Sequence, residues 1–99
     1  MRPSLVIAID FDDTFTADCE AWRNVILILQ QHMHTVICVS ARRDTPSNRQ
    51  ELTQSLPLGV KVLLSYDTPK RLFAKQHGYN VDIWIDDMPE AIVTKEDIK

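Results

Sequence analysis

Apolar runs and amphipathic segments alternate along this chain. Four runs rich in Val, Ile and Leu lie at 4–9, 35–40, 60–65 and 81–85. Continuous β-branched runs of this length are typical of strands that are buried on both faces of a parallel sheet. The pattern therefore predicts four strands.

The segments between these runs have helical spacing. From 18 to 32 the chain predicts a helix, with Thr16 or Asp18 available as its cap. Its apolar stripe comprises Trp22, Val25, Ile26 and Leu29. Because Leu27 and Ile28 widen this stripe, we expect most of the helix to be covered. A shorter helix is predicted at 48–56, after Pro46, and a third at 68–77, closed by Gly78.

Strands that alternate with helices indicate βαβ units, right-handed crossovers and ligands at the carboxyl ends of the strands. We expect an α/β fold of three layers, Rossmann-like, with a parallel sheet of about four strands. Ninety-nine residues leave little room for a second lobe, so 1–99 is expected to be one domain.

Polar residues suited to phosphate chemistry follow three of the four predicted strands. They are Asp10, Asp12, Asp13 and Thr14; Ser40 and Arg42; and Asp86 and Asp87. In an extended segment residues i and i+2 face the same way, so Asp10 and Asp12 can present two carboxylates to one phosphorus atom. One can attack while the other transfers protons.

Two neighbouring carboxylates repel a phosphate dianion unless a divalent cation neutralises them. Asp86 and Asp87 can supply further ligands, and a set made only of oxygen atoms favours Mg²⁺. The alternative is that these acids are solvated loop caps. Two acidic motifs after two apolar strands argue against it.

These residues resemble the motifs of the haloacid dehalogenase superfamily, most of whose members are phosphatases. Asp10-Phe11-Asp12-Asp13-Thr14 is similar to its first motif, and Ser40-Ala41-Arg42 to its second. Lys70 would be the third motif, and Asp86-Asp87 resembles the acidic fourth. The match spans nearly the whole chain.

The resemblance implies a role for each residue. Asp10 would form an aspartyl-phosphate, and Asp12 would protonate the leaving oxygen and then deprotonate the attacking water. Mg²⁺ would be held by the Asp10 carboxylate, the Asp12 carbonyl and Asp86, with Asp87 as a direct or water-mediated ligand. The residues assigned to phosphate binding are Thr14, Ser40, Arg42 and Lys70.

Local physics bears on two of these residues. Thr68-Pro69 is a cap-and-first-turn pair, so Lys70 falls in a first turn, where the helix dipole disfavours a cation. Lys70 is therefore either functional or an ordinary solvated charge. Arg42 could contact the phosphate or the leaving group, or could lie on a loop with Arg43.

The sequence departs from the family pattern in two respects. Asp13 stands where the family usually has Gly. Only 25 residues separate Thr14 from Ser40, and the predicted helix uses most of them. The cap module that many relatives carry at this place cannot fit, and the second cap position, between Ser40 and Lys70, is filled by a helix and a strand.

Composition limits the partners. A net charge of −3 and a pI near 5.5 give no basic footprint for general nucleic-acid binding. The expected partner is a phosphorylated substrate, either a small molecule or a macromolecular end. The first apolar run is too short for a signal or a membrane span, and Cys19 and Cys38 lack metal-ligand spacing, so we expect a cytoplasmic protein with reduced thiols.

Two other functions compete with hydrolysis. A phospho-accepting receiver domain would carry its phosphorylated aspartate on the third strand. Here the third strand ends in Ser65-Tyr66-Asp67, whereas the Asp-x-Asp-x-Thr motif follows the first strand. The order of the motifs along the chain therefore favours hydrolysis. An inactive relative used as a binding or assembly module is the second alternative. Because no fifth strand is evident, we also predict a homo-oligomer, formed through the edge of the fourth strand or through the first helix near Trp22.

Overall fold

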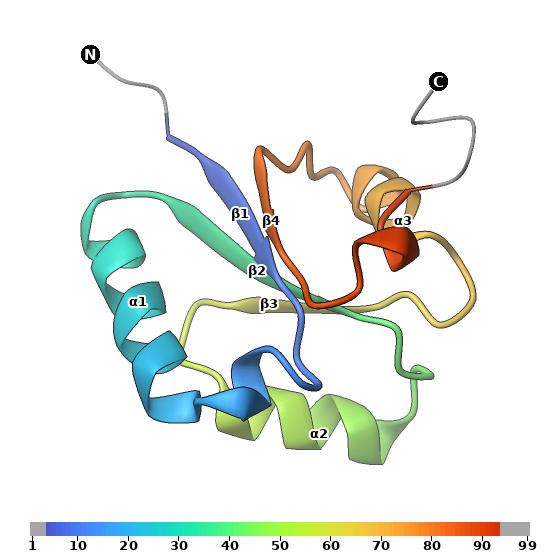
Figure 1. The fold of residues 1–99 in the computed structure, drawn as a ribbon, viewed down its shortest axis with the longest axis horizontal. Coiled ribbons are helices and arrows are strands. Elements are labelled where there is room, and N and C mark those ends of the chain that lie inside the picture. Colours follow the sequence, from blue (N-terminus) through green and yellow to red (C-terminus); the bar gives the residue numbers. More distant parts are fainter. Residues whose placement is uncertain (1–3, 94–99) are drawn as a thin grey trace.

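The structure, a computed structural model, describes residues 4–93. Four strands, three α-helices and two short 3₁₀ helices follow one another along this part of the chain (Figure 1). The strands are β1 (Val6–Ile9), β2 (Thr35–Ser40), β3 (Lys61–Leu64) and β4 (Ile83–Ile85). The helices are η1 (Phe15–Ala17), α1 (Cys19–Gln31), α2 (Pro46–Ser55), α3 (Lys70–Gln76) and η2 (Pro89–Ala91).

The four strands form one parallel sheet in the order β3-β2-β1-β4. Ile9 pairs with Cys38 on one side and with Ile85 on the other. The Asp10 amide then donates to the Ile85 carbonyl at 2.9 Å, which extends the pairing by one residue. Since the strands are parallel, the segments that follow β1, β2 and β4 all leave the sheet at the same end.

The helices cover both faces of the sheet (Figure 1). On one face α1 and α2 pack against a core of Ile9, Phe11, Phe15, Ile26, Val36, Cys38, Leu52, Leu56, Val62 and Leu64. On the other face α3 packs, through Ala74, against Ala8, Ile37, Val39 and Leu63. The β1 residues Ile7, Ala8 and Ile9 are at most 3% exposed, so the prediction of a strand buried on both faces is confirmed.

Two helices begin at other residues than predicted. The helix expected at 48–56 begins at Pro46, because the Thr45 hydroxyl accepts from the Asn48 amide and Pro46 suits the first helical position. The helix expected at 68–77 begins at Lys70. Its N-cap is Pro69, which offers no side-chain acceptor, so the predicted cap-and-first-turn pair at Thr68-Pro69 is wrong.

The outer surface of α1 differs from its prediction. Ile28 is 55% exposed, and Val25 and Leu27 are exposed as well, because only the stripe centred on Ile26 faces the sheet. Strand β4 lies at an edge of the sheet with Ile83 45% exposed. Self-association through this edge or through α1 stays a prediction.

The intervals that could hold a cap module are filled by regular structure. Helices η1 and α1 occupy the chain between Thr14 and β2, and α2 with β3 lies between β2 and α3. No helix within residues 4–93 has both the length and the apolar character needed to cross a membrane.

Candidate active site

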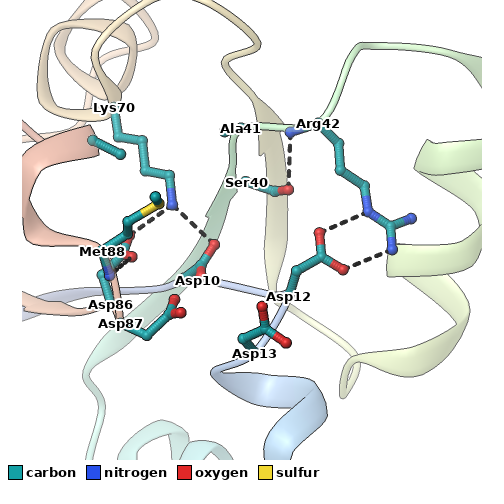
Figure 2. A pocket seen from close by; sticks show the side chains of 11 residues that line it. Asp10, Asp12, Asp13, Ser40, Ala41, Arg42, Lys70, Asp86, Asp87 and Met88 are labelled. Carbon is teal, nitrogen blue, oxygen red and sulfur yellow. Dashed lines mark hydrogen bonds and ion pairs between the residues drawn. The ribbon is translucent and has the colours of Figure 1, made fainter.

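A cavity of about 310 Å³ opens at the carboxyl ends of the strands. It lies where strand order changes direction, with β2 on one side of β1 and β4 on the other, which is where open α/β sheets place their ligands. The residues that line it are Asp10, Asp12, Asp13, Ser40, Ala41, Arg42, Lys70, Asp86, Asp87, Met88 and Ala91 (Figure 2). Seven of the eight predicted site residues are in this set, and Thr14 is not.

Lys70 lies between two carboxylates on one side of the cavity (Figure 2). Its Nζ donates to Asp10 Oδ1 at 2.9 Å and to Asp86 Oδ2 at 2.6 Å. All three side chains are at least nine-tenths buried. A buried ammonium is tolerated only with such partners, so Lys70 is no solvated surface charge.

Thr14 contacts two of the acids. Its hydroxyl is 3.3 Å from Asp10 Oδ2 and 3.1 Å from Asp87 Oδ1, and it accepts from the Asp87 amide at 3.2 Å. A further amide, that of Met88, donates to Asp86 Oδ1 at 2.9 Å. These contacts hold the carboxylates of β1 and β4 against each other.

Burial and the neighbouring charges shift the pKa values of Asp10 and Lys70 in opposite directions. Burial raises the pKa of Asp10 above its usual value of 3.8, although the bonds from Lys70 oppose the rise. Burial by itself would lower the pKa of Lys70, but the bonds to Asp86 and Asp10 outweigh it and raise that pKa. Lys70 therefore stays charged at neutral pH.

Three carboxylates in this half of the cavity could hold a metal ion. Oxygen atoms of Asp10, Asp86 and Asp87 lie within 4.8 Å of one another. The three carboxylates face one ammonium, that of Lys70, so a divalent cation would balance the charge. A donor set of oxygen atoms alone fits Mg²⁺ better than zinc or copper.

Asp12 lies across the cavity from Lys70 and is held by Arg42 (Figure 2). Arg42 Nε and Nη2 donate to the two oxygens of Asp12 at 2.9 and 2.8 Å. The bonds from Arg42 hold the pKa of Asp12 below its usual 3.8 despite partial burial. In this arrangement Asp12 is an ionised acceptor.

Helix α2 supplies two residues that sequence reasoning missed. Glu51 accepts from Arg42 Nη1 at 2.8 Å and from Nη2 at 3.2 Å, and Asn48 Oδ1 accepts from Nη1 at 3.2 Å. The signal was the spacing of three residues between Asn48 and Glu51, which places both on one face of a helix that follows Arg42 closely. Arg42 is thus fixed between β1 and α2.

Ser40 and Asp13 complete the wall. Ser40 is the last residue of β2 and is 1% exposed, and its hydroxyl accepts from the Arg42 amide at 3.2 Å. Asp13 has φ of 63°, in the left-handed region that glycine adopts most easily. Asp is among the few side chains other than glycine that tolerate this conformation.

Searches for similar proteins among protein-family models, curated sequences and solved structures found no match for this chain.

Proposed function

We propose that this protein is a Mg²⁺-dependent phosphohydrolase, a phosphomonoesterase of the haloacid dehalogenase type, that acts through an aspartyl-phosphate. One observation carries the proposal. Asp10, paired with the buried Lys70, and Asp12 line the same cavity and come from the one segment that follows β1. A nucleophile, a phosphate-binding cation and a second carboxylate for proton transfer are the groups that phosphoester hydrolysis requires.

In the first half of the reaction a carboxylate oxygen of Asp10 attacks phosphorus. The bond from phosphorus to the ester oxygen breaks, and that oxygen takes a proton from Asp12. In the second half a water molecule attacks the aspartyl-phosphate and gives its proton to Asp12. Inorganic phosphate leaves, Asp10 is regenerated as a carboxylate, and Asp12 is again protonated.

Lys70 and Ser40 would bind the phosphoryl oxygens, since both side chains line the cavity. When bound at Asp10, Asp86 and Asp87, Mg²⁺ would neutralise the acids and polarise a phosphoryl oxygen. Thr14 was predicted to bind phosphate, but its hydroxyl contacts Asp10 and Asp87. We assign it the role of positioning those two carboxylates.

Arg42 has a part in both states of Asp12. While Arg42 holds it, Asp12 is ionised, which is the form that accepts a proton from water. To donate a proton Asp12 must first be released from Arg42 and take up a proton from solvent. The phosphoryl oxygens of a substrate offer Arg42 another anion with two acceptors, and Glu51 keeps the guanidinium within reach.

The topology and the motif order support a Rossmann-like fold of this family. The order β3-β2-β1-β4, with helices on both faces, is that of the first four strands of a doubly wound sheet. A receiver domain is less well supported, because Asp67 after β3 is exposed and lies outside the cavity that Asp10 lines. An inactive binding or assembly module is the remaining alternative.

Release of phosphate from a chromogenic phosphate monoester, with Mg²⁺ and with EDTA, tests the proposal. We expect Mg²⁺-dependent turnover that falls by roughly 10³-fold or more in Asp10→Asn, since the amide keeps the shape but cannot attack phosphorus. Asp44→Asn removes an exposed acid outside the cavity and should keep wild-type turnover. Turnover that survives in Asp10→Asn would contradict the mechanism. If the wild-type protein released no phosphate, the inactive binding or assembly module would be favoured.

A further inference from the structure

A second cavity adjoins the candidate active site. It measures about 250 Å³ and lies between the loop that follows β3 and helix η2. The two cavities share the small side chains of Ala41 and Ala91, so they lie side by side. A ligand whose phosphate occupies the first cavity can therefore extend into the second.

The charges of the two cavities differ. The first contains Lys70 and Arg42, whereas no Lys or Arg is among the described residues that line the second. Its wall consists of Ala41, Ser65, Tyr66, Asp67, Thr68, Pro69, Glu90, Ala91 and Val93. The charged members are both carboxylates, so this wall attracts hydrogen-bond donors and cations and repels anions.

Tyr66 forms a fixed part of this wall. Its φ of 52° places it in the left-handed region, and its ring is covered by the guanidinium of Arg43 at 4.5 Å. Arg43 Nη2 also donates to the Tyr66 hydroxyl at 2.6 Å. The positive charge of Arg43 is thus engaged by the tyrosine, and it offsets at most one of the two carboxylates.

We propose that the second cavity binds the alcohol part of the substrate and selects for its charge. This inference rests on the proposed phosphohydrolase function. The cavity favours an alcohol that ends in an amine or in hydroxyl groups, and it disfavours one with a carboxylate or a second phosphate. The substrate class is then a small phosphomonoester of an amino alcohol or a polyol. Nucleic-acid ends, in which further phosphates flank the reacting one, are disfavoured by the same two carboxylates.

A matched series of short alkyl phosphates that end in an ammonium, a hydroxyl or a carboxylate group tests this selection. With Mg²⁺ present, we expect kcat/KM to be about tenfold higher for the ammonium ester than for the carboxylate ester, with the hydroxyl ester between them. In the double variant Asp67→Asn/Glu90→Gln the ratio of ammonium to carboxylate ester should fall toward one. Glu20→Gln, in the first turn of α1 and outside both cavities, should keep the wild-type ratio.

The outcomes separate this inference from the function on which it rests. Equal kcat/KM values for the three esters, or a ratio that survives in the double variant, would overturn the inference while hydrolysis of the chromogenic ester upheld the function. A phosphorylated oligonucleotide that reacts as fast as the ammonium ester would overturn it as well. No release from any ester would overturn both.

Discussion

The two halves of the candidate active-site cavity stabilise their charged groups in different ways. In the half next to β4, Asp10, Asp86 and Lys70 are buried, and acids outnumber the one ammonium. In the half next to α2, Arg42 joins two carboxylates, those of Asp12 and Glu51, that are about half exposed. Charge in the buried half is costly and incompletely balanced, so a further cation could be held there, whereas solvent can stabilise the charges of the other half.

Removal of the buried ammonium should have the largest effect on stability. In Lys70→Met, Asp10 and Asp86 lose their shared partner, and we expect a loss of about 3 kcal/mol in the free energy of unfolding at neutral pH. Lys75→Met, which removes an exposed lysine of the same helix, is the matched control and should cost well under 1 kcal/mol. Urea unfolding measures both, and equal losses would show that Lys70 is not buried between the acids.

Addition of Mg²⁺ should stabilise the half of the cavity next to β4. A ligand at 100 times its Kd stabilises a protein by about 2.7 kcal/mol, so the wild-type Tm should rise with Mg²⁺. Asp86→Asn keeps the size of the side chain but removes a charged ligand, and it should need much more Mg²⁺ for the same rise. Asp44→Asn should follow the wild-type titration. An unchanged titration in Asp86→Asn would place the ion elsewhere.

Arg42→Met removes the cation from the exposed half of the cavity. It should lower the free energy of unfolding less than Lys70→Met does. The pKa values of Asp12 and Glu51 lie below their usual 3.8 and 4.5 because both carboxylates bond to Arg42. A lowered pKa means that this stabilisation is present above the usual values and is lost as pH falls through the lowered ones. The difference between wild type and variant should therefore be largest near neutral pH and disappear as pH falls through the lowered pKa values of Asp12 and Glu51. A difference that does not depend on pH would show that Arg42 acts through packing alone.

The smallest effect is expected at Asp13, between the two halves. Asp13→Gly relieves the left-handed backbone at φ of 63° and should raise the free energy of unfolding by a few tenths of a kcal/mol. The same substitution at Asp67, which has no positive φ, should lower it. The midpoints of urea unfolding measure both changes. A destabilised Asp13→Gly would mean that contacts of the Asp13 carboxylate contribute more to stability than relief of its left-handed backbone.

Local signals in the chain were enough to predict the four parallel strands, the three helices between them and the meeting of Asp10, Ser40 and Asp86 at one edge. This works because apolar periodicity and parallel connections depend on short stretches of sequence. The ends of helices were less well predicted. Whether Thr45 or a later residue caps α2 depends on small differences between competing hydrogen bonds.

The choice of partners inside the cavity was decided by the tertiary structure. Lys70 could have been solvated. It is buried because α3 brings it to Asp10, 60 residues earlier in the chain, and to Asp86. Arg42 likewise acquires Glu51 only through the packing of α2. Sequence specified which charged groups reach this edge of the sheet, but desolvation and packing geometry determined which of them pair and which retain a net charge for a cation to balance.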